Sequence, residues 1–129
     1  MLTENQIREF KKQLDDRYFV LCEEVRQELI STDDQTYIEL AGQVHDLGEA
    51  SVADLLVDIQ LAEIDKHIEE IREIDAALMR IAAGRYGVCK DCKSDIAPER
   101  LGAYPTASRC HRCAVNHERN HPRKSGPTL

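Results

Sequence analysis

Four cysteines near the C-terminus have the type and the spacing of a metal site. Cys89 and Cys92 form one C-x2-C pair, Cys110 and Cys113 form a second, and 17 residues separate the pairs. Two intervening residues let both sulfurs of a pair converge on one ion, and two pairs supply four thiolates for a tetrahedral Zn²⁺. We therefore predict one structural zinc ion here. A shell of four thiolates leaves no coordination position for water or substrate, so the pattern argues against a metalloenzyme.

Two other uses of these thiols remain open, a redox or disulfide pair and an iron–sulfur cluster. The N-terminus lacks the apolar segment of a secretory signal, and no apolar run is long enough to span a membrane. We therefore expect a cytoplasmic protein, in a compartment where disulfides are rare. Turn glycines and basic residues beside the pairs favour zinc over a cluster. The fifth cysteine, Cys22, lies far upstream in a helical pattern, where we expect a packed core thiol.

The charge of the chain is unevenly distributed. The 129 residues carry a net charge of −7, but residues 1–84 hold 20 acidic and 8 basic side chains, whereas residues 85–129 hold 4 acidic and 9 basic ones. The first segment is thus −12 and the second +5. Each charge run by itself is equally consistent with a solvated face. The segregation as a whole favours oriented docking on a large partner.

Two helical patterns precede the cysteines. The first places apolar residues three or four apart on one face, and Thr3 with Gln6 is a candidate capping box at its start. Its members are Ile7, Phe10, Leu14, Tyr18, Leu21, Val25 and Leu29. The run Ser31-Thr32-Asp33-Asp34 is a possible break, after which a short apolar patch resumes over residues 37–44. The first arm is therefore either two helices or one kinked helix.

The second pattern has the spacing of a coiled-coil seam. Its mean step is close to 3.4 residues, and its members are Val57, Leu61, Ile64, Ile68, Ile71, Ile74, Leu78 and Ile81. Ser51 is a candidate N-cap, and Gly84 stands where a glycine ends a helix. We predict one helix over residues 51–83, about 50 Å long at 1.5 Å per residue. Such a rod must pack its apolar stripe against the first arm.

The length of the two arms places the bend of the hairpin near residues 45–51. Gly48 supplies turn freedom there, and Asp46 and Glu49 would bring two carboxylates to the end of the rod. Ordinary turn and helix-start chemistry also explains acidic residues at this place. The predicted fold is mainly α, a long antiparallel helical hairpin (coiled coil) with a C-terminal four-cysteine zinc finger and a short C-terminal helix. The expected parts are the hairpin over 1–83, the finger with its helix over 84–121 and a disordered tail over 122–129.

The finger resembles that of the DksA/TraR family of bacterial RNA polymerase regulators. The resemblance is carried by G-x-Y-G-x-C-x-x-C over residues 84–92 and by R-L-x-A-x-P-T-A-x-x-C-x-x-C over residues 100–113. It is close over residues 84–117 and rests on architecture alone over the hairpin. It implies a zinc-binding transcription regulator that binds core polymerase, not the promoter, and brings an acidic hairpin tip through the secondary channel toward the active site. No enzymatic activity is implied.

Two departures from the family concern its functional positions. The family's tip pattern is D-x-x-D-x-A, where this chain has Asp46, Glu49 and Ser51. The resemblance thus implies a regulatory tip at these residues with an altered effect on initiation. Members that sense guanosine tetraphosphate with the polymerase use basic residues at positions that align with Glu73, Tyr104 and Ala114. These side chains cannot supply cationic contacts to a polyphosphate, so we predict weak or absent alarmone dependence.

The C-terminal stretch is basic, and a short helix is expected from His111 to about Asn120. Arg109, Arg112 and Arg119 are candidate polymerase contacts; a solvated tail and a phosphate-binding surface remain alternatives. With only Tyr86 and Tyr104 as aromatic residues in the finger, base stacking has little support. We expect a monomer without sequence-specific DNA binding and without a membrane partner. A zinc-ribbon nucleic-acid-binding module with a helical oligomerisation arm is the second hypothesis, and a redox- or zinc-responsive sensor is the third.

Overall fold

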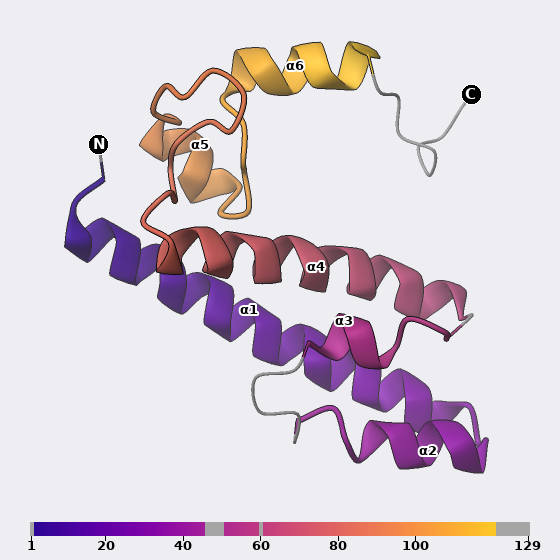
Figure 1. The fold of residues 1–129 in the computed structure, drawn as a ribbon. Helices are drawn as coiled ribbons and strands as arrows, with labels where there is room; N and C mark the ends of the chain where they lie inside the picture. The colour runs from indigo at the N-terminus through magenta and orange to yellow at the C-terminus, as the bar shows by residue number, and fades with distance from the viewer. Residues whose placement is uncertain (1, 46–50, 60, 121–129) are drawn as a thin grey trace.

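A computed structural model of the chain describes residues 2–45, 51–59 and 61–120. The described part is mainly α-helical, as the sequence predicts, and Figure 1 shows two long helices side by side with the finger above one end. Asp46, Glu49 and the expected tail over 122–129 lie outside the described residues. The helices are α1 (Glu4–Ser31), α2 (Gln35–Ala41), α3 (Val52–Leu55), α4 (Ala62–Ala82), α5 (Pro98–Ala103) and α6 (His111–Asn120).

Helix α1 begins at the predicted capping box. The Gln6 backbone N–H donates to Thr3 Oγ1 at 3.1 Å, and the Thr3 N–H donates to Gln6 Oε1 at 2.8 Å. Both bonds satisfy amide groups that the first turn of a helix leaves unpaired. The helix has 28 residues and is therefore about 42 Å long. Its buried face follows the predicted stripe, with the thiol of Cys22 beside it: Leu14, Leu21, Cys22, Val25 and Leu29.

Helix α4 runs antiparallel to α1 and completes the hairpin. Arg17 of α1 donates twice to the carboxylate of Glu70 in α4, at 2.7 and 2.9 Å, while His67 of α4 lies against residues closer to the C-terminal end of α1. The buried side chains of α4 are largely those of the predicted seam: Ile64, Ile68, Ile71, Ile74 and Ala77. Burial of each large aliphatic side chain stabilises the fold by about 1.5–3 kcal/mol relative to exposure.

The first arm consists of two helices separated at the predicted break. The Thr32 hydroxyl donates to the Leu29 carbonyl at 2.7 Å, and Asp33 has a φ of 60°, in the left-handed region. Asp34 then caps α2, because its side chain accepts from the Thr36 N–H at 2.9 Å. A left-handed residue between a satisfied helix end and a new N-cap turns the chain back, so α2 packs along α1.

The prediction of one continuous helix over residues 51–83 is wrong. Helix α3 ends at Leu55, and α4 begins only at Ala62. Because α3 packs against α4, it buries Val52, Ala53 and Leu56 in the core. A straight helix would carry these side chains beyond the end of α1, where no described helix would cover them. Burial of this apolar surface favours the folded-back arrangement over a longer rod.

The finger follows α4 directly and packs against the start of α1. Gly84, with a φ of 72°, ends α4 as predicted. The rings of Phe10 and Tyr86 lie 5.8 Å apart, and the Tyr86 hydroxyl donates to the Pro105 carbonyl at 2.7 Å. The finger is thereby joined to the hairpin through side chains as well as through the chain itself. Of the helices that the structure describes, none combines the length and the apolar character needed to cross a membrane.

Candidate metal centre

The first cysteine pair lies in a tight turn closed by backbone hydrogen bonds. An isolated antiparallel bridge joins Val88 to Asp95. Within it the Cys89 N–H donates to the Ser94 carbonyl at 2.8 Å, and the Lys93 N–H donates to the Cys89 carbonyl at 3.0 Å. Lys93 has a φ of 66°, which an L-residue adopts at a cost. The turn brings the sulfurs of its two cysteines to the same side.

The second cysteine pair lies at the start of α6 and is tied to the first. Helix α5 and the turn after it lead to Cys110, whose carbonyl accepts from the Ala114 N–H at 2.9 Å in the first turn of α6. The Lys90 N–H of the first turn donates to the Ser108 carbonyl at 2.9 Å. That bond holds the two pairs in register, although 17 residues separate them in the sequence.

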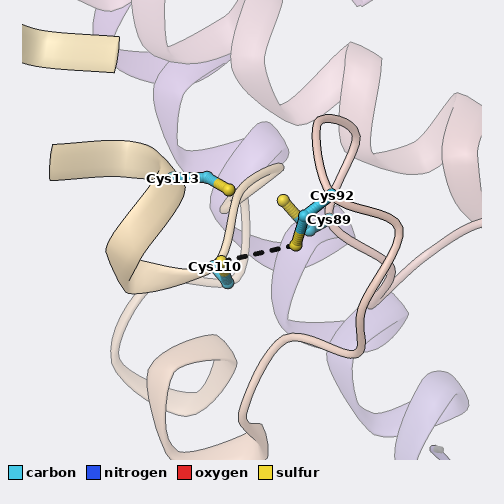
Figure 2. A group of neighbouring side chains, drawn as sticks. All are labelled: Cys89, Cys92, Cys110 and Cys113. Carbon is cyan, nitrogen blue, oxygen red and sulfur yellow. Dashed lines mark hydrogen bonds between the residues drawn. The ribbon is translucent and has the colours of Figure 1, made fainter. Parts of the chain in front are cut away.

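The four sulfurs converge on one point, and Figure 2 shows them directed toward one another. All four lie within 4.8 Å of one another, and those of Cys92 and Cys110 are 3.8 Å apart. A tetrahedral zinc site with Zn–S bonds of about 2.3 Å requires S···S distances of about 3.8 Å. Cys89 is buried and the other three are partly exposed. This arrangement fits one structural Zn²⁺, as the spacing predicts.

The electrostatics of the cluster explain why a cation stabilises it. Burial opposes ionisation of Cys89, but hydrogen bonds from the backbone of Cys92, Cys110 and Asp91 hold its pKa at about 6. The neighbouring Cys110 raises the pKa of Cys113 to about 12. Four thiols at this separation cannot all ionise without a counter-ion, because thiolates repel one another. A divalent cation removes this repulsion, so metal binding and folding of the finger are coupled.

A set of contacts that the sequence analysis did not single out joins the finger to α4. Arg80 Nη2 donates to the Thr106 carbonyl at 3.1 Å, and the Thr106 hydroxyl donates to Glu73 at 3.4 Å. Arg80 and Glu73 are seven residues apart and lie on the same face of the helix. Thr106 belongs to the P-T-A segment of the finger motif, and this motif was the feature of the sequence that could have indicated its contacts with α4. These bonds fix the direction in which the finger leaves the hairpin.

The described residues that bound the expected tip lie beside the middle of α1. His45 Nε2 is 3.1 Å from Glu23 Oε1, and its ring stacks on Phe19 with centroids 5.1 Å apart. Ser51 is half-buried and donates to Asp75 Oδ2 of α4 at 2.8 Å. Both ends of segment 46–50 are thus anchored along the hairpin. The far end of the hairpin lies instead near the turns over residues 32–34 and 56–59. The prediction that the bend near residues 45–51 forms the end of the rod is therefore wrong for its described residues, His45 and Ser51.

The predicted basic patch divides into two parts. Arg109 Nε donates to Asp91 Oδ2 at 2.7 Å, so this side chain closes an ion pair within the finger. Arg112 and Arg119 are exposed on α6, seven residues and about two helical turns apart. The structure therefore leaves Arg112 and Arg119 available to a partner on one face of α6 and engages Arg109 elsewhere.

Comparison with known proteins places the finger in a described family. Residues 84–119 match the family model for the prokaryotic dksA/traR C4-type zinc finger. An uncharacterized protein of Aquifex aeolicus is 38% identical over 74 residues, which are 57% of this chain and 49% of that protein. The RNA polymerase-binding transcription factor DksA of Caulobacter vibrioides is 32% identical over 74 residues, or 57% of this chain and 52% of the factor. The chain thus spans about half the length of these relatives.

The fold also has a counterpart among solved structures. The structure of transcription factor DksA2 from Pseudomonas aeruginosa aligns with a TM-score of 0.62 and 24% sequence identity, covering 93% of this chain and 88% of that one. At this identity the match shows a shared fold. The aligned region includes the hairpin, which lies outside the residues that the finger family model matches.

Proposed function

We propose that this chain, which belongs to the DksA/TraR family through its C4-type zinc finger, regulates transcription by binding RNA polymerase directly. The match of residues 84–119 around four convergent sulfurs carries the proposal. A relative with 32% identity is named as an RNA polymerase-binding transcription factor. The charge segregation agrees with this role, because an acidic hairpin and a basic finger favour one orientation on a partner.

In this proposal the zinc ion is structural and the protein has no enzymatic step. The four sulfurs would hold the ion and, through the bond from Lys90 to Ser108, keep the two halves of the finger together. Arg80, through its bond to Thr106, and Tyr86, through its contact with Phe10, then set the finger against the hairpin. The zinc centre thus fixes the base from which the hairpin projects, and the regulatory residues lie elsewhere.

The proposed mode of action is entry of the hairpin into the secondary channel of the polymerase. Asp46 and Glu49 would act as the regulatory pair, and Ser51 would modify their effect. Because the flanking residues His45 and Ser51 lie along the hairpin, this pair would act from its side and not from its far end. Ser51, directly after segment 46–50, donates to Asp75, so the chain is anchored on the hairpin where this segment ends. Arg112 and Arg119 would contact the polymerase surface around the channel entrance.

We further propose that the effect on transcription is independent of guanosine tetraphosphate. Glu73, Tyr104 and Ala114 line one cleft between α4, α5 and α6, so the three positions that lack basic side chains are gathered in one place. Basic side chains also line this cleft: Arg80 and Arg100 donate to backbone carbonyls, Arg109 pairs with Asp91, and Lys90 lies in the same lining. Independence from the alarmone is therefore expected from the acidic, phenolic and methyl side chains at these three positions, which supply no cationic contact to a polyphosphate.

Equilibrium binding of the zinc-loaded chain to purified core polymerase and to duplex DNA tests this proposal. We expect binding to core polymerase and only weak, salt-sensitive binding to DNA. Tight DNA binding without binding to core polymerase would overturn the proposal and favour the nucleic-acid-binding alternative. A transcription assay with and without guanosine tetraphosphate tests whether the effect of the chain is independent of this alarmone. A change in transcription that occurs only with the alarmone present would contradict the proposed independence.

A further inference from the structure

A groove with a mostly apolar surface runs along the exposed side of α1, and we call it the α1 groove. Two parallel rows of side chains four residues apart form it, with His67 of α4 at one side. The rows are Phe19, Glu23 and Gln27, and Val20, Glu24 and Glu28. The volume is about 730 Å³, and the residues cover nine helical rises, about 14 Å. Phe19 and Val20 are 60% and 43% exposed, so apolar surface faces solvent at one end of the groove.

Two carboxylates of the α1 groove, those of Glu24 and Glu28, share one histidine as their ion-pair partner among the described residues. Glu24 Oε2 lies 2.9 Å from His67 Nε2, and Glu28 Oε1 lies 3.1 Å from His67 Nδ1. One imidazole, which carries at most one positive charge, thus faces two carboxylates. The second oxygen of Glu28 is buried and has no hydrogen-bond partner among the described residues. An unsatisfied carboxylate oxygen is costly, and an outward turn of the Glu28 side chain toward a donor from a bound partner would remove this cost.

The third carboxylate of the α1 groove, that of Glu23, lies at the same end as the exposed Phe19 and Val20. Glu23 accepts from Arg26 at 2.8 Å and is 3.1 Å from His45, so its local charge is largely balanced. The α1 groove therefore combines an open apolar end, formed by Phe19 and Val20, with an under-compensated acidic end at Glu24 and Glu28. A ligand that fits both ends has an apolar anchor followed by positively charged side chains.

We propose that the α1 groove binds a basic amphipathic helix of RNA polymerase. This inference rests on the proposed function and adds to it the kind of polymerase segment that is recognised. The space between two rows of residues four apart accepts the ridge of a second helix. An apolar side chain of that helix would cover Phe19 and Val20, as in other helix-in-groove complexes. Arg or Lys one or two turns further along would reach Glu24 and Glu28.

A second copy of this chain fits the α1 groove poorly. Two α1 grooves face to face would bring at least four under-compensated carboxylates together, and like charges across an interface oppose association. The basic helix α6 of another copy carries Arg112 and Arg119 but no exposed large apolar side chain among its described residues, so it offers no anchor for Phe19 and Val20. The charge pattern therefore favours a different protein as the occupant.

Affinity measurements with core polymerase test the inference. Phe19→Ala removes the apolar end of the groove, and Met79→Ala is a matched control, because Met79 is 71% exposed on α4 away from the groove. We expect Phe19→Ala to weaken binding at least about tenfold, as loss of an apolar anchor does, and Met79→Ala to change it by less than about twofold. Circular dichroism checks that both variants keep their helices. The double variant Glu24→Gln/Glu28→Gln should bind more weakly and with a smaller dependence on salt.

A photocrosslinking residue at position 20 identifies the occupant. Crosslinks to a polymerase helix that carries Arg or Lys beside apolar residues would support the inference. Tight binding of the unmodified chain together with equal binding of Phe19→Ala, or crosslinks only to an acidic segment, would overturn the inference and leave the proposed function standing. Failure of the unmodified chain to bind core polymerase would overturn both.

Discussion

Replacement of Gly87 by alanine is a sharp test of how the finger is joined to the hairpin. Gly87 has a φ of 82°, and a Cβ at this position would lie 2.8 Å from Leu2 Cδ1. Gly84 provides a matched control, because it has a φ of 72° and nothing within 4 Å of its added Cβ. Both substitutions impose the same kind of backbone strain, but only the one at Gly87 must also displace a side chain.

The expected magnitudes follow from these two terms. A left-handed conformation costs an L-residue about 1–2 kcal/mol, and the reduced entropy of the unfolded chain returns about 0.4–1 kcal/mol. Gly84→Ala should therefore lower the free energy of unfolding by about 1 kcal/mol. Displacement of the half-buried Leu2 sacrifices roughly half of a full leucine burial, about 1 kcal/mol more. We expect about 2 kcal/mol for Gly87→Ala.

Urea unfolding of the zinc-loaded chain, followed by circular dichroism, measures both values. The difference should disappear in a Leu2→Ala background, because the displaced side chain is then absent and the two substitutions become coupled through it. Equal destabilisation by Gly84→Ala and Gly87→Ala in the parent chain would refute the contact between Leu2 and the finger.

Three further perturbations have outcomes set by single contacts. Lys93→Gly should raise the free energy of unfolding by up to about 1 kcal/mol in the same urea experiment, because it relieves a φ of 66°; a loss of stability would contradict the proposed strain. Ser51→Ala removes the bond to Asp75 and the cap of α3, so we expect a loss of about 1–2 kcal/mol, and no loss would contradict the anchoring. Burial raises the pKa of Cys22 to about 11, so its thiol stays protonated at about pH 8. A thiol reagent should then label no cysteine rapidly in the zinc-loaded chain, four after chelation and five after unfolding, and rapid labelling of Cys22 in the folded chain would contradict this.

The metal centre could be predicted from the sequence because its geometry is encoded locally. Two residues between the cysteines of each pair determine the turn, and the remaining long-range requirement is that the turns face each other. The capping box at Thr3, the helix end at Gly84 and the extent of α6 are likewise confirmed. Each depends on neighbours within about four residues, the range over which local patterns determine backbone conformation.

The path of the chain between α1 and α4 could not be predicted from such patterns. The apolar spacing runs without interruption through residues 57–64, so it favours a continuous helix. The structure interrupts it because Val52, Ala53 and Leu56 find more burial against the hairpin than at the end of a rod. The roles of His67 and Asp75 were missed for the same reason, since both depend on which residues of the other helices lie opposite. Tertiary burial decided these features.

The lifetime of promoter complexes formed by RNA polymerase holoenzyme tests the central claim most directly. The intact chain, Asp46→Asn/Glu49→Gln and the control Asp54→Asn/Asp58→Asn, which neutralises two exposed carboxylates near the same segment, should bind polymerase equally. We predict that the intact chain and the control change the lifetime and that the Asp46/Glu49 variant does not. An equal change by all three proteins, or no change by any of them, would contradict it.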